Sequence, residues 1–275
     1  MEKFSVLMSL YIKEKPEYFC QCMDSVLNQT VLPDQIVIVK DGPLTDELET
    51  VLNHYVNENT NLYTIVPLKK NVGLGLALAE GIKHCRNNLV ARMDTDDIAV
   101  KKRFELQLKE FEKDPKLDIC GSNIVEFEGT TDNIVSKRIV PLDDASIKKY
   151  QKRRDAFNHM TVMYKKEMVL KAGNYQSCLL MEDTLLWVHM ILAGAKCKNV
   201  EEPLVYARVG RDMYDRRGGW NYYQKYKVGR KRVYETGYIS LLDYWMTCTI
   251  QFIVAMFPRR WRALVFKKLL RKQIN

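Results

Sequence analysis

The sequence predicts an α/β fold in which helices cover both faces of a mixed, mainly parallel β-sheet. Short β-branched or apolar runs alternate with amphipathic segments over the first half of the chain, at the spacing typical of strand–helix–strand units. The 275 residues are 47% hydrophobic and 28% charged, a composition that supports a folded chain with a sizeable core. The seven cysteines are scattered without a Cys-x-x-Cys pair, so a reducing compartment is expected and a zinc site is not.

The first strand–helix–strand unit opens the chain. Strands are expected at 4–11 and 35–42, and the segment 16–30 between them has apolar residues along one helical face. The same alternation then continues. The elements expected next are, in order, a helix at 46–58, a strand at 61–68, a helix at 73–85 and a strand at 88–93.

The second half of the chain is less regular. A polar helix is expected at 102–114, a strand pair near 118–129 and a mixed segment around 158–164. Residues 182–195 predict a helix whose acidic first turn is favoured by the helix dipole.

The positive charge of the chain is confined to its C-terminal region. Residues 208–275 contain sixteen Lys and Arg against four Asp and Glu, whereas residues 1–207 contain 27 against 30. We therefore place a boundary near residue 207, between an α/β domain and a helical, basic, aromatic-rich tail.

An acidic cluster follows the strand at 88–93. Asp94, Asp96 and Asp97 would raise one another's pKa unless a cation lay between them. Asp94 and Asp96 have the spacing to reach one hard cation, although a solvated turn, or a helix cap made by Asp97, explains the pattern equally well. Asp41 ends another strand, and since ligands bind at the carboxyl ends of such strands, these residues point to one cleft.

Two nucleotide-binding motifs are excluded. Gly73 and Gly75 begin a dinucleotide fingerprint, but Leu78 occupies the position of its third glycine. The chain also lacks a Gly-x-x-x-x-Gly-Lys-Ser/Thr phosphate loop. A nicotinamide enzyme and a P-loop ATPase are therefore disfavoured.

Residues 4 to about 205 resemble the family 2 glycosyltransferases, which have the Rossmann-like GT-A fold. The resemblance depends on the order of the motifs SVLNQT, IVKDGP, NVGLGLALAEGI, ARMDTDDI, NHMTV and EDTLLW. It is greatest to bacterial enzymes of capsule, exopolysaccharide and lipopolysaccharide synthesis. It implies inverting transfer of one sugar from a nucleotide sugar, with UDP-hexose as the commonest donor, to a lipid-linked, polyprenyl diphosphate oligosaccharide.

The resemblance also implies a donor site that uses Mn²⁺ or Mg²⁺. Ser9 and Tyr11 would line the nucleobase pocket and Asp41 would contact the base, while Asp94 and Asp96 would hold ribose, diphosphate and metal. The other donor-site residues taken from the matching motifs are Asn71, Gly73, Arg92 and Thr95.

On the acceptor side, Asp183 resembles the catalytic base of the family. Glu182 would orient that base or contact the acceptor, and His159 would donate a hydrogen bond to the acceptor or accept one. Without the resemblance, the acidic pair is explained by the helix dipole alone.

Three positions depart from the family pattern. Lys40 stands where the family often has an acidic residue, and Pro43 stands where it has serine, so the base pocket is expected to differ in detail. Phe257 replaces the glutamine of the QxxRW motif found in processive synthases, so a single transfer is expected.

The tail predicts attachment to a membrane surface. Residues 245–257 carry no charge, but a helix of that length measures about 20 Å, too short for a hydrocarbon core of about 30 Å. The segment 258–273 predicts a helix with basic residues outside one apolar face, which suits an anionic bilayer surface. That face comprises Trp261, Leu264, Val265 and Leu269. The N-terminus shows no secretory signal, so the protein is expected in the cytoplasm, bound peripherally to the inner face of the membrane.

Other interpretations remain open at this stage. The tail helix would also suit packing on the α/β domain or a dimer interface. Aromatic and basic residues interleave over 212–238, a pattern compatible with single-stranded nucleic acid, although we expect no nucleic-acid partner. A metal-dependent nucleotidyltransferase would use similar paired carboxylates.

Overall fold

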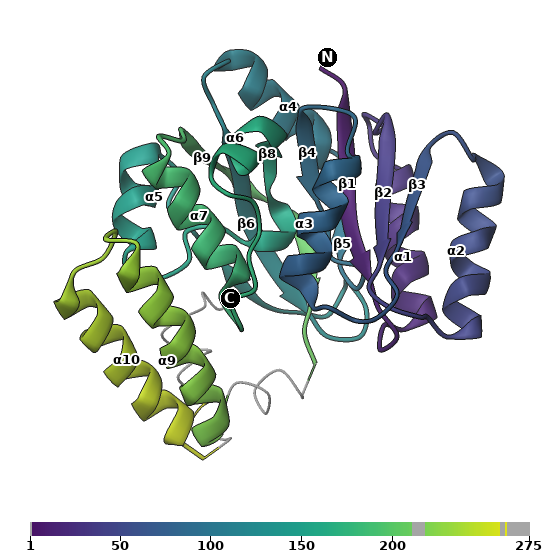
Figure 1. Ribbon diagram of the computed structural model, residues 1–275. Helices are drawn as coiled ribbons and strands as arrows, with labels where there is room; N and C mark the ends of the chain where they lie inside the picture. Colours follow the sequence, from purple (N-terminus) through teal and green to yellow (C-terminus); the bar gives the residue numbers. More distant parts are fainter. Residues whose placement is uncertain (1, 211–217, 259–261, 263–275) are drawn as a thin grey trace.

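The structure, a computed structural model, describes residues 2–210, 218–258 and Arg262. Its centre is a nine-stranded sheet with helices on both faces, and a helical hairpin lies beside it (Figure 1). The main path of the sheet runs β3-β2-β1-β4-β8-β6-β9-β5, and β7 pairs with β6. The expected α/β class, with helices on both faces, is confirmed.

The first half of the chain builds the parallel part of the sheet. Strands β1, β2, β3 and β4 pair in parallel, with β1 between β2 and β4. The elements are β1 (Phe4–Leu10), α1 (Pro16–Leu27), β2 (Gln35–Lys40), α2 (Asp46–Glu58), β3 (Tyr63–Pro67), α3 (Leu74–His84) and β4 (Leu89–Arg92). Each falls within one or two residues of the segment predicted for it, apart from the last residues of the α1 segment.

The second half adds strands of both directions. Strand β8 runs antiparallel to both β4 and β6, and the long strand β9 runs parallel to β6. The elements are β5 (Ile98–Ala99), α4 (Arg103–Lys113), β6 (Ile119–Phe127), β7 (Ile134–Arg138), α5 (Asp144–Gln151), the 3₁₀ helix η1 (His159–Thr161), β8 (Met163–Lys165), α6 (Lys166–Lys171), α7 (Glu182–Leu192) and β9 (Cys197–Arg208). Residues 118–129 contain one strand, β6, rather than two, because β7, which pairs antiparallel with β6, begins only at Ile134.

Side chains alternate along the strands into two cores. On β1, Phe4, Val6 and Met8 face a core shared with α1, α2 and α4, whereas Leu7 faces a core shared with α3 and α7. This alternation is the consequence of the two-residue period of a strand. The two cores pack helices against both faces of the sheet, and the loops at its edge are anchored to these packed strands.

The hairpin formed by α9 (Gly219–Glu235) and α10 (Leu241–Met256) packs on α7 through a third core. Leu185 and Val188 of α7 meet Val233 and Cys248 of the hairpin there. Ser240 begins α10 with a capping box, since its hydroxyl accepts the N–H of Asp243 and the Asp243 carboxylate accepts the N–H of Ser240.

None of the described helices has the length and apolar character needed to cross a bilayer. The predicted surface helix, with Trp261, Leu264, Val265 and Leu269, lies outside the described residues.

Candidate active site

The candidate site lies where β1, β2 and β4 end. These strands are parallel neighbours, so their carboxyl ends meet at one edge of the sheet. Ser9 lies near the end of β1 and is partly buried, and Tyr11 just beyond it is exposed. Asp41 follows β2, and the acidic cluster follows β4. The sequence was therefore right that these residues share one edge.

Asp41 fastens the loop that precedes α3. It is buried, and its carboxylate accepts the N–H groups of Val72 at 2.7 Å and Gly73 at 3.1 Å. Asn71 returns a side-chain N–H to the Asp41 carbonyl at 3.3 Å. Gly42 has a φ of +89°, and a Cβ there would lie 2.7 Å from the Asn71 nitrogen. Contact between Asp41 and a nucleobase stays a prediction, since the carboxylate partners in this structure are backbone amides.

The acidic loop after β4 is held from several directions. The buried guanidinium of Arg92 forms an ion pair with Asp94. The Thr95 hydroxyl donates to Glu14 at 2.6 Å, and the Cys22 thiol lies 3.2 Å from the Asp94 carbonyl. Thr95 therefore orients the loop, and the Asp94 carboxylate is held by a cation from the strand itself.

Arg208, at the end of β9, braces the same loop. Its backbone N–H donates to the Asp97 carboxylate at 2.7 Å, and its Nε donates to the Asp96 carbonyl at 2.9 Å. The guanidinium carbon lies 3.9 Å from the ring centroid of Tyr18 and 4.5 Å from that of Phe127. The sequence analysis missed this residue, since nothing in its neighbourhood along the chain distinguishes it from other basic residues.

The acidic loop fits a hard divalent cation. Burial, together with the charges of Asp94 and Glu14, raises the pKa of Asp96 to about 7, so a cation would relieve a real electrostatic cost. Within the described residues, no group of three or more His, Cys, Asp or Glu side chains is arranged to hold a metal ion. Asp96 and Asp94 would thus supply one or two ligands, and diphosphate and water oxygens the rest, as is usual for Mg²⁺.

Glu182 and Asp183 form the first turn of α7, which packs against the start of α3. A Cβ added to Gly75 would lie 2.9 Å from the Glu182 Cβ, so glycine permits this close approach. Burial raises the pKa of Glu182. The charge of Arg92 lowers this pKa, and the charge of Asp94 raises it. The charge of Asp94 therefore acts on Glu182, as expected if both acidic groups belong to one site.

Asp183 is a partly buried carboxylate whose pKa is raised. Burial, then the charges of Asp155 and Glu182, raise the pKa of Asp183 to about 8, although its Oδ1 accepts the Thr184 N–H at 2.7 Å. Such a group can accept a proton near neutral pH. Asp155 was not among the residues singled out from the sequence.

His159 belongs to an aromatic cluster next to Arg92. Its Nε2 lies 3.0 Å from the Tyr175 hydroxyl, and its ring centroid is 5.8 Å from that of Trp187. Burial, and then the Arg92 charge, hold the pKa of His159 well below its usual range, so the ring stays neutral. Its contact with an acceptor stays a prediction.

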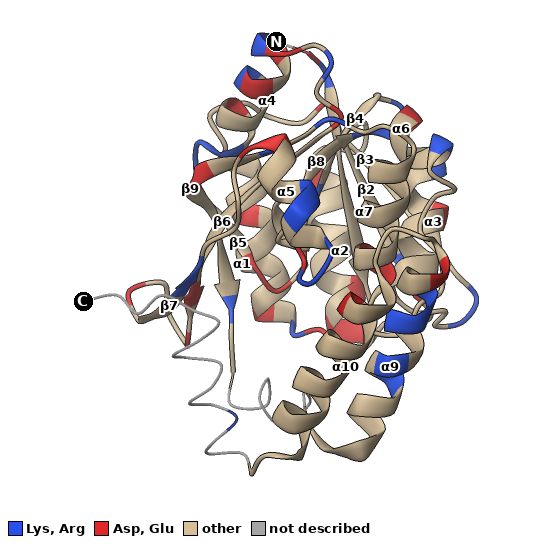
Figure 2. Cartoon of the chain, turned by 90° about the vertical axis from the view of Figure 1, so that its left-hand side faces the viewer, with Lys and Arg blue, Asp and Glu red and all other residues tan. Residues whose placement is uncertain are grey.

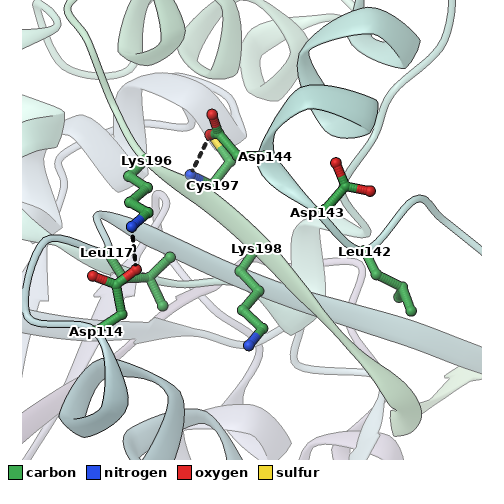
Figure 3. Close-up of a pocket in the computed structure, with 8 residues that line it drawn as sticks. All are labelled: Asp114, Leu117, Leu142, Asp143, Asp144, Lys196, Cys197 and Lys198. Carbon is green, nitrogen blue, oxygen red and sulfur yellow. Dashed lines mark hydrogen bonds and ion pairs between the residues drawn. The ribbon is translucent and has the colours of Figure 1, made fainter.

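A separate hollow of about 310 Å³ lies at the opposite edge of the sheet (Figure 3), where β6 and β9 begin. Lys196 pairs with Asp114 at 2.6 Å, and the Asp144 carboxylate accepts the Cys197 N–H at 2.8 Å. Its charges are largely paired within the protein, and it is remote from both acidic clusters. The hollow is lined by Asp114, Leu117, Leu142, Asp143, Asp144, Lys196, Cys197 and Lys198.

Comparison of the sequence with known families and proteins gives consistent matches. The family described as "Glycosyl transferase family 2" matches residues 5–172. The amylovoran biosynthesis glycosyltransferase AmsE of Erwinia amylovora is 39% identical over 251 residues, which cover 90% of this chain and 92% of that protein. The UDP-Gal:alpha-D-GlcNAc-diphosphoundecaprenol beta-1,3-galactosyltransferase of Escherichia coli is 34% identical over 271 residues, which cover 98% of this chain and 97% of that protein.

Comparison with solved structures supports the fold. Residues 1–349 of S. aureus TarS in complex with UDP-GlcNAc match with a TM-score of 0.62 and 17% identity, over 97% of this chain and 76% of that chain. The mannosyltransferase PcManGT of Pyrobaculum calidifontis, in complex with GDP-Man and Mn²⁺, matches with a TM-score of 0.62 and 13% identity, over 97% of this chain and 81% of that chain. At these identities the likeness concerns the fold alone, which is that of the GT-A glycosyltransferases.

Proposed function

The chain belongs to glycosyltransferase family 2, and on this basis we propose that it transfers one sugar, with inversion, from a nucleotide sugar to a lipid-linked glycan of a bacterial surface polysaccharide. The protein is a glycosyltransferase, which selects sugar transfer over the nucleotidyl transfer left open by the sequence. The observation that carries the proposal is the position of two carboxylate pairs: Asp94 and Asp96 lie in the loop after β4, and Glu182 and Asp183 lie in the first turn of α7, which packs against the start of α3.

The proposed donor is a UDP-hexose. The Escherichia coli relative is named for UDP-Gal, and TarS structures contain UDP and UDP-GlcNAc, whereas PcManGT contains GDP-Man. In the proposal, Ser9, Tyr11 and Asp41 line the base pocket, and Asp94 and Asp96 receive the ribose and diphosphate.

Structures of similar fold contain Mn²⁺, which supports dependence on a divalent cation, and we propose Mn²⁺ or Mg²⁺ here. When bound, the ion supplies positive charge that stabilises the departing nucleoside diphosphate. The protein contributes Asp96 and Asp94 as oxygen ligands, and Arg208 keeps the loop that carries them in place.

Asp183 is the proposed general base. It accepts the proton of the acceptor hydroxyl while that oxygen attacks the anomeric carbon of the donor and the bond to the diphosphate breaks. Because the carboxylate must be ionised to act and its pKa is raised to about 8, the ionised fraction, and with it the rate, should rise with pH across the neutral range. Glu182 and His159 are proposed to hold the acceptor beside it.

The proposed acceptor is a polyprenyl diphosphate glycan, and this places the enzyme at the inner face of the membrane. The Escherichia coli relative is named for a diphosphoundecaprenol acceptor. Most of α10 is free of charge (Figure 2), and its outward face is apolar, while exposed Lys225 and Lys231 lie on the adjacent α9. An anionic bilayer matches both features. The exposed apolar residues are Leu241, Leu242, Trp245, Ile250, Phe252, Ile253 and Met256.

The proposal is tested by incubating the purified protein with UDP-hexoses, Mn²⁺ and a GlcNAc-diphosphate-polyprenol, and by measuring the product mass. We expect a product that is one hexose heavier with one donor. Asp114→Asn, at the opposite sheet edge, serves as the matched control and should retain full turnover. Consumption of a sugar 1-phosphate and a nucleoside triphosphate, with no hexose transfer, would overturn the proposal.

A further inference from the structure

We propose that Asp155 is a positioning residue for transfer, which holds the first turn of α7 and thereby the Asp183 carboxylate in place. The inference rests on the proposed base role of Asp183 and adds a residue to which neither the family match nor the relatives assign a role. Asp155 lies in the segment between α5 and η1, far along the chain from Asp183.

The tether between Asp155 and α7 is direct. The Thr184 hydroxyl donates to the Asp155 Oδ1 at 2.5 Å, while the Thr184 backbone N–H donates to the Asp183 Oδ1 at 2.7 Å. Thr184 is buried, so neither bond competes freely with water. One residue of α7 thereby links both carboxylates, and the position of Asp155 sets that of the first turn.

Asp155 is itself fixed by α5 and β7. The buried Gln151 of α5 donates to the Asp155 carboxylate at 3.3 Å and accepts the Ala156 N–H at 2.7 Å. Arg138 of β7 donates to the Asp155 carbonyl at 2.8 Å. Side chains of β7, α5 and α7 therefore converge on this residue, as expected of a residue that holds other elements in place rather than of a surface side chain.

Several charged groups around Asp155 also act on the ionisation of Asp183. Glu182 and Asp155 oppose ionisation of Asp183, and Arg138 favours it. Tyr175 faces the pair from the preceding loop, and Tyr226 of α9 faces Asp155. Because burial, Asp155 and Glu182 raise the pKa of Asp183 and Arg138 lowers it, loss of the Asp155 charge should lower that pKa, and loss of the Arg138 charge should raise it further.

The experiment compares the pH dependence of kcat in two variants with opposite expected shifts. In wild type, the rate rises with pH as Asp183 ionises. Asp155→Asn retains an oxygen that can accept from Thr184 but removes the charge, so the ascending limb should move to lower pH by at least about half a unit. That shift corresponds to about threefold more ionised base on the limb. Arg138→Gln should move it to higher pH.

Two controls separate positioning from general damage. Thr184→Val keeps the charge of Asp155 and removes the tether, so kcat should fall while the KM for the donor stays unchanged. Asp114→Asn should follow the wild-type profile. The inference is overturned if Asp155→Asn or Arg138→Gln, folded by thermal melting, gives a limb that coincides with wild type, even with a lower plateau. Full transfer by Asp183→Asn would instead remove the base role itself.

Discussion

At the scale of single residues, the site concentrates negative charge near the buried guanidinium of Arg92. Arg92 is almost fully buried and pairs with Asp94, and its charge also lowers the pKa of Glu182. An isolated buried charge is costly, so this pairing offsets part of the cost of burying the guanidinium. Asp96 forms no ion pair among the described residues, and burial, with the charges of Asp94 and Glu14, raises its pKa to about 7. Asp96 therefore has more to gain from a bound divalent ion than Asp94, which Arg92 already pairs.

The brace made by Arg208 gives the first prediction at this scale. Arg208→Lys keeps the charge but loses the planar donor that reaches the Asp96 carbonyl, so metal-dependent UDP binding should weaken by about tenfold, as for loss of one charged hydrogen bond. The affinity is measured by isothermal titration of UDP into each protein in the presence of Mn²⁺. Arg86→Lys, whose guanidinium donates to the Asp34 carbonyl at the opposite sheet edge, is the control. Equal affinity in Arg208→Lys and wild type would refute the brace.

At the scale of elements, the parallel half of the sheet could be predicted because each strand and helix there shows the spacing of apolar residues typical of its secondary structure. Strand β9 could not, since Glu201, Glu202 and Pro203 interrupt its apolar pattern, where the pairing with β6 shifts register. Residues of β6 are all buried, so they show no alternation to mark where one strand ends. Asp155 and Arg208 were missed for a related reason, because their roles depend on partners distant in sequence.

The contact between α3 and α7 gives a second prediction. Alanine in a helix is usually more stable than glycine by about 0.5–1 kcal/mol, yet a Cβ on Gly75 would meet Glu182 at 2.9 Å and the Gln176 carbonyl at 3.0 Å. We expect Gly75→Ala to leave the melting temperature nearly unchanged and to lower kcat several-fold, because α7 must move. Leu76→Ala, on the exposed side of α3, should lower neither. Unaltered kcat in Gly75→Ala would show that the close approach is not needed.

The exposed face of α10 gives a third prediction. Replacement of Leu242, Trp245 and Ile253 by glutamine removes apolar area from this face alone, so binding to phosphatidylglycerol vesicles should fall by at least fivefold in co-sedimentation. Transfer to a soluble acceptor analogue should persist. A control that changes the exposed Leu32 and Ile139 to glutamine should bind like wild type. Undiminished vesicle binding by the α10 variant would mean that this face is not the membrane contact.

At the scale of the whole molecule, the fold brings the proposed donor site and the proposed catalytic base to one edge of the sheet. The parallel strands present the proposed donor site, and α7 presents the proposed base from the other side of the same cleft. The hairpin of α9 and α10 packs on α7 through its buried side, so the exposed apolar face of α10 belongs to a unit attached to the helix that carries Asp183. This arrangement would let a membrane-bound acceptor approach the base while the nucleotide sugar enters from solution.

The most direct test of the account separates binding from transfer in three proteins: wild type, Asp96→Asn and Asp183→Asn. UDP binding with Mn²⁺ is measured by isothermal titration, and hexose transfer is measured on the same preparations. The account predicts that Asp96→Asn loses metal-dependent binding, whereas Asp183→Asn binds UDP like wild type and transfers at least about a hundredfold more slowly, given that general base catalysis contributes about 10²–10⁴-fold. Wild-type transfer by Asp183→Asn, or metal-dependent binding that survives in Asp96→Asn, would contradict it.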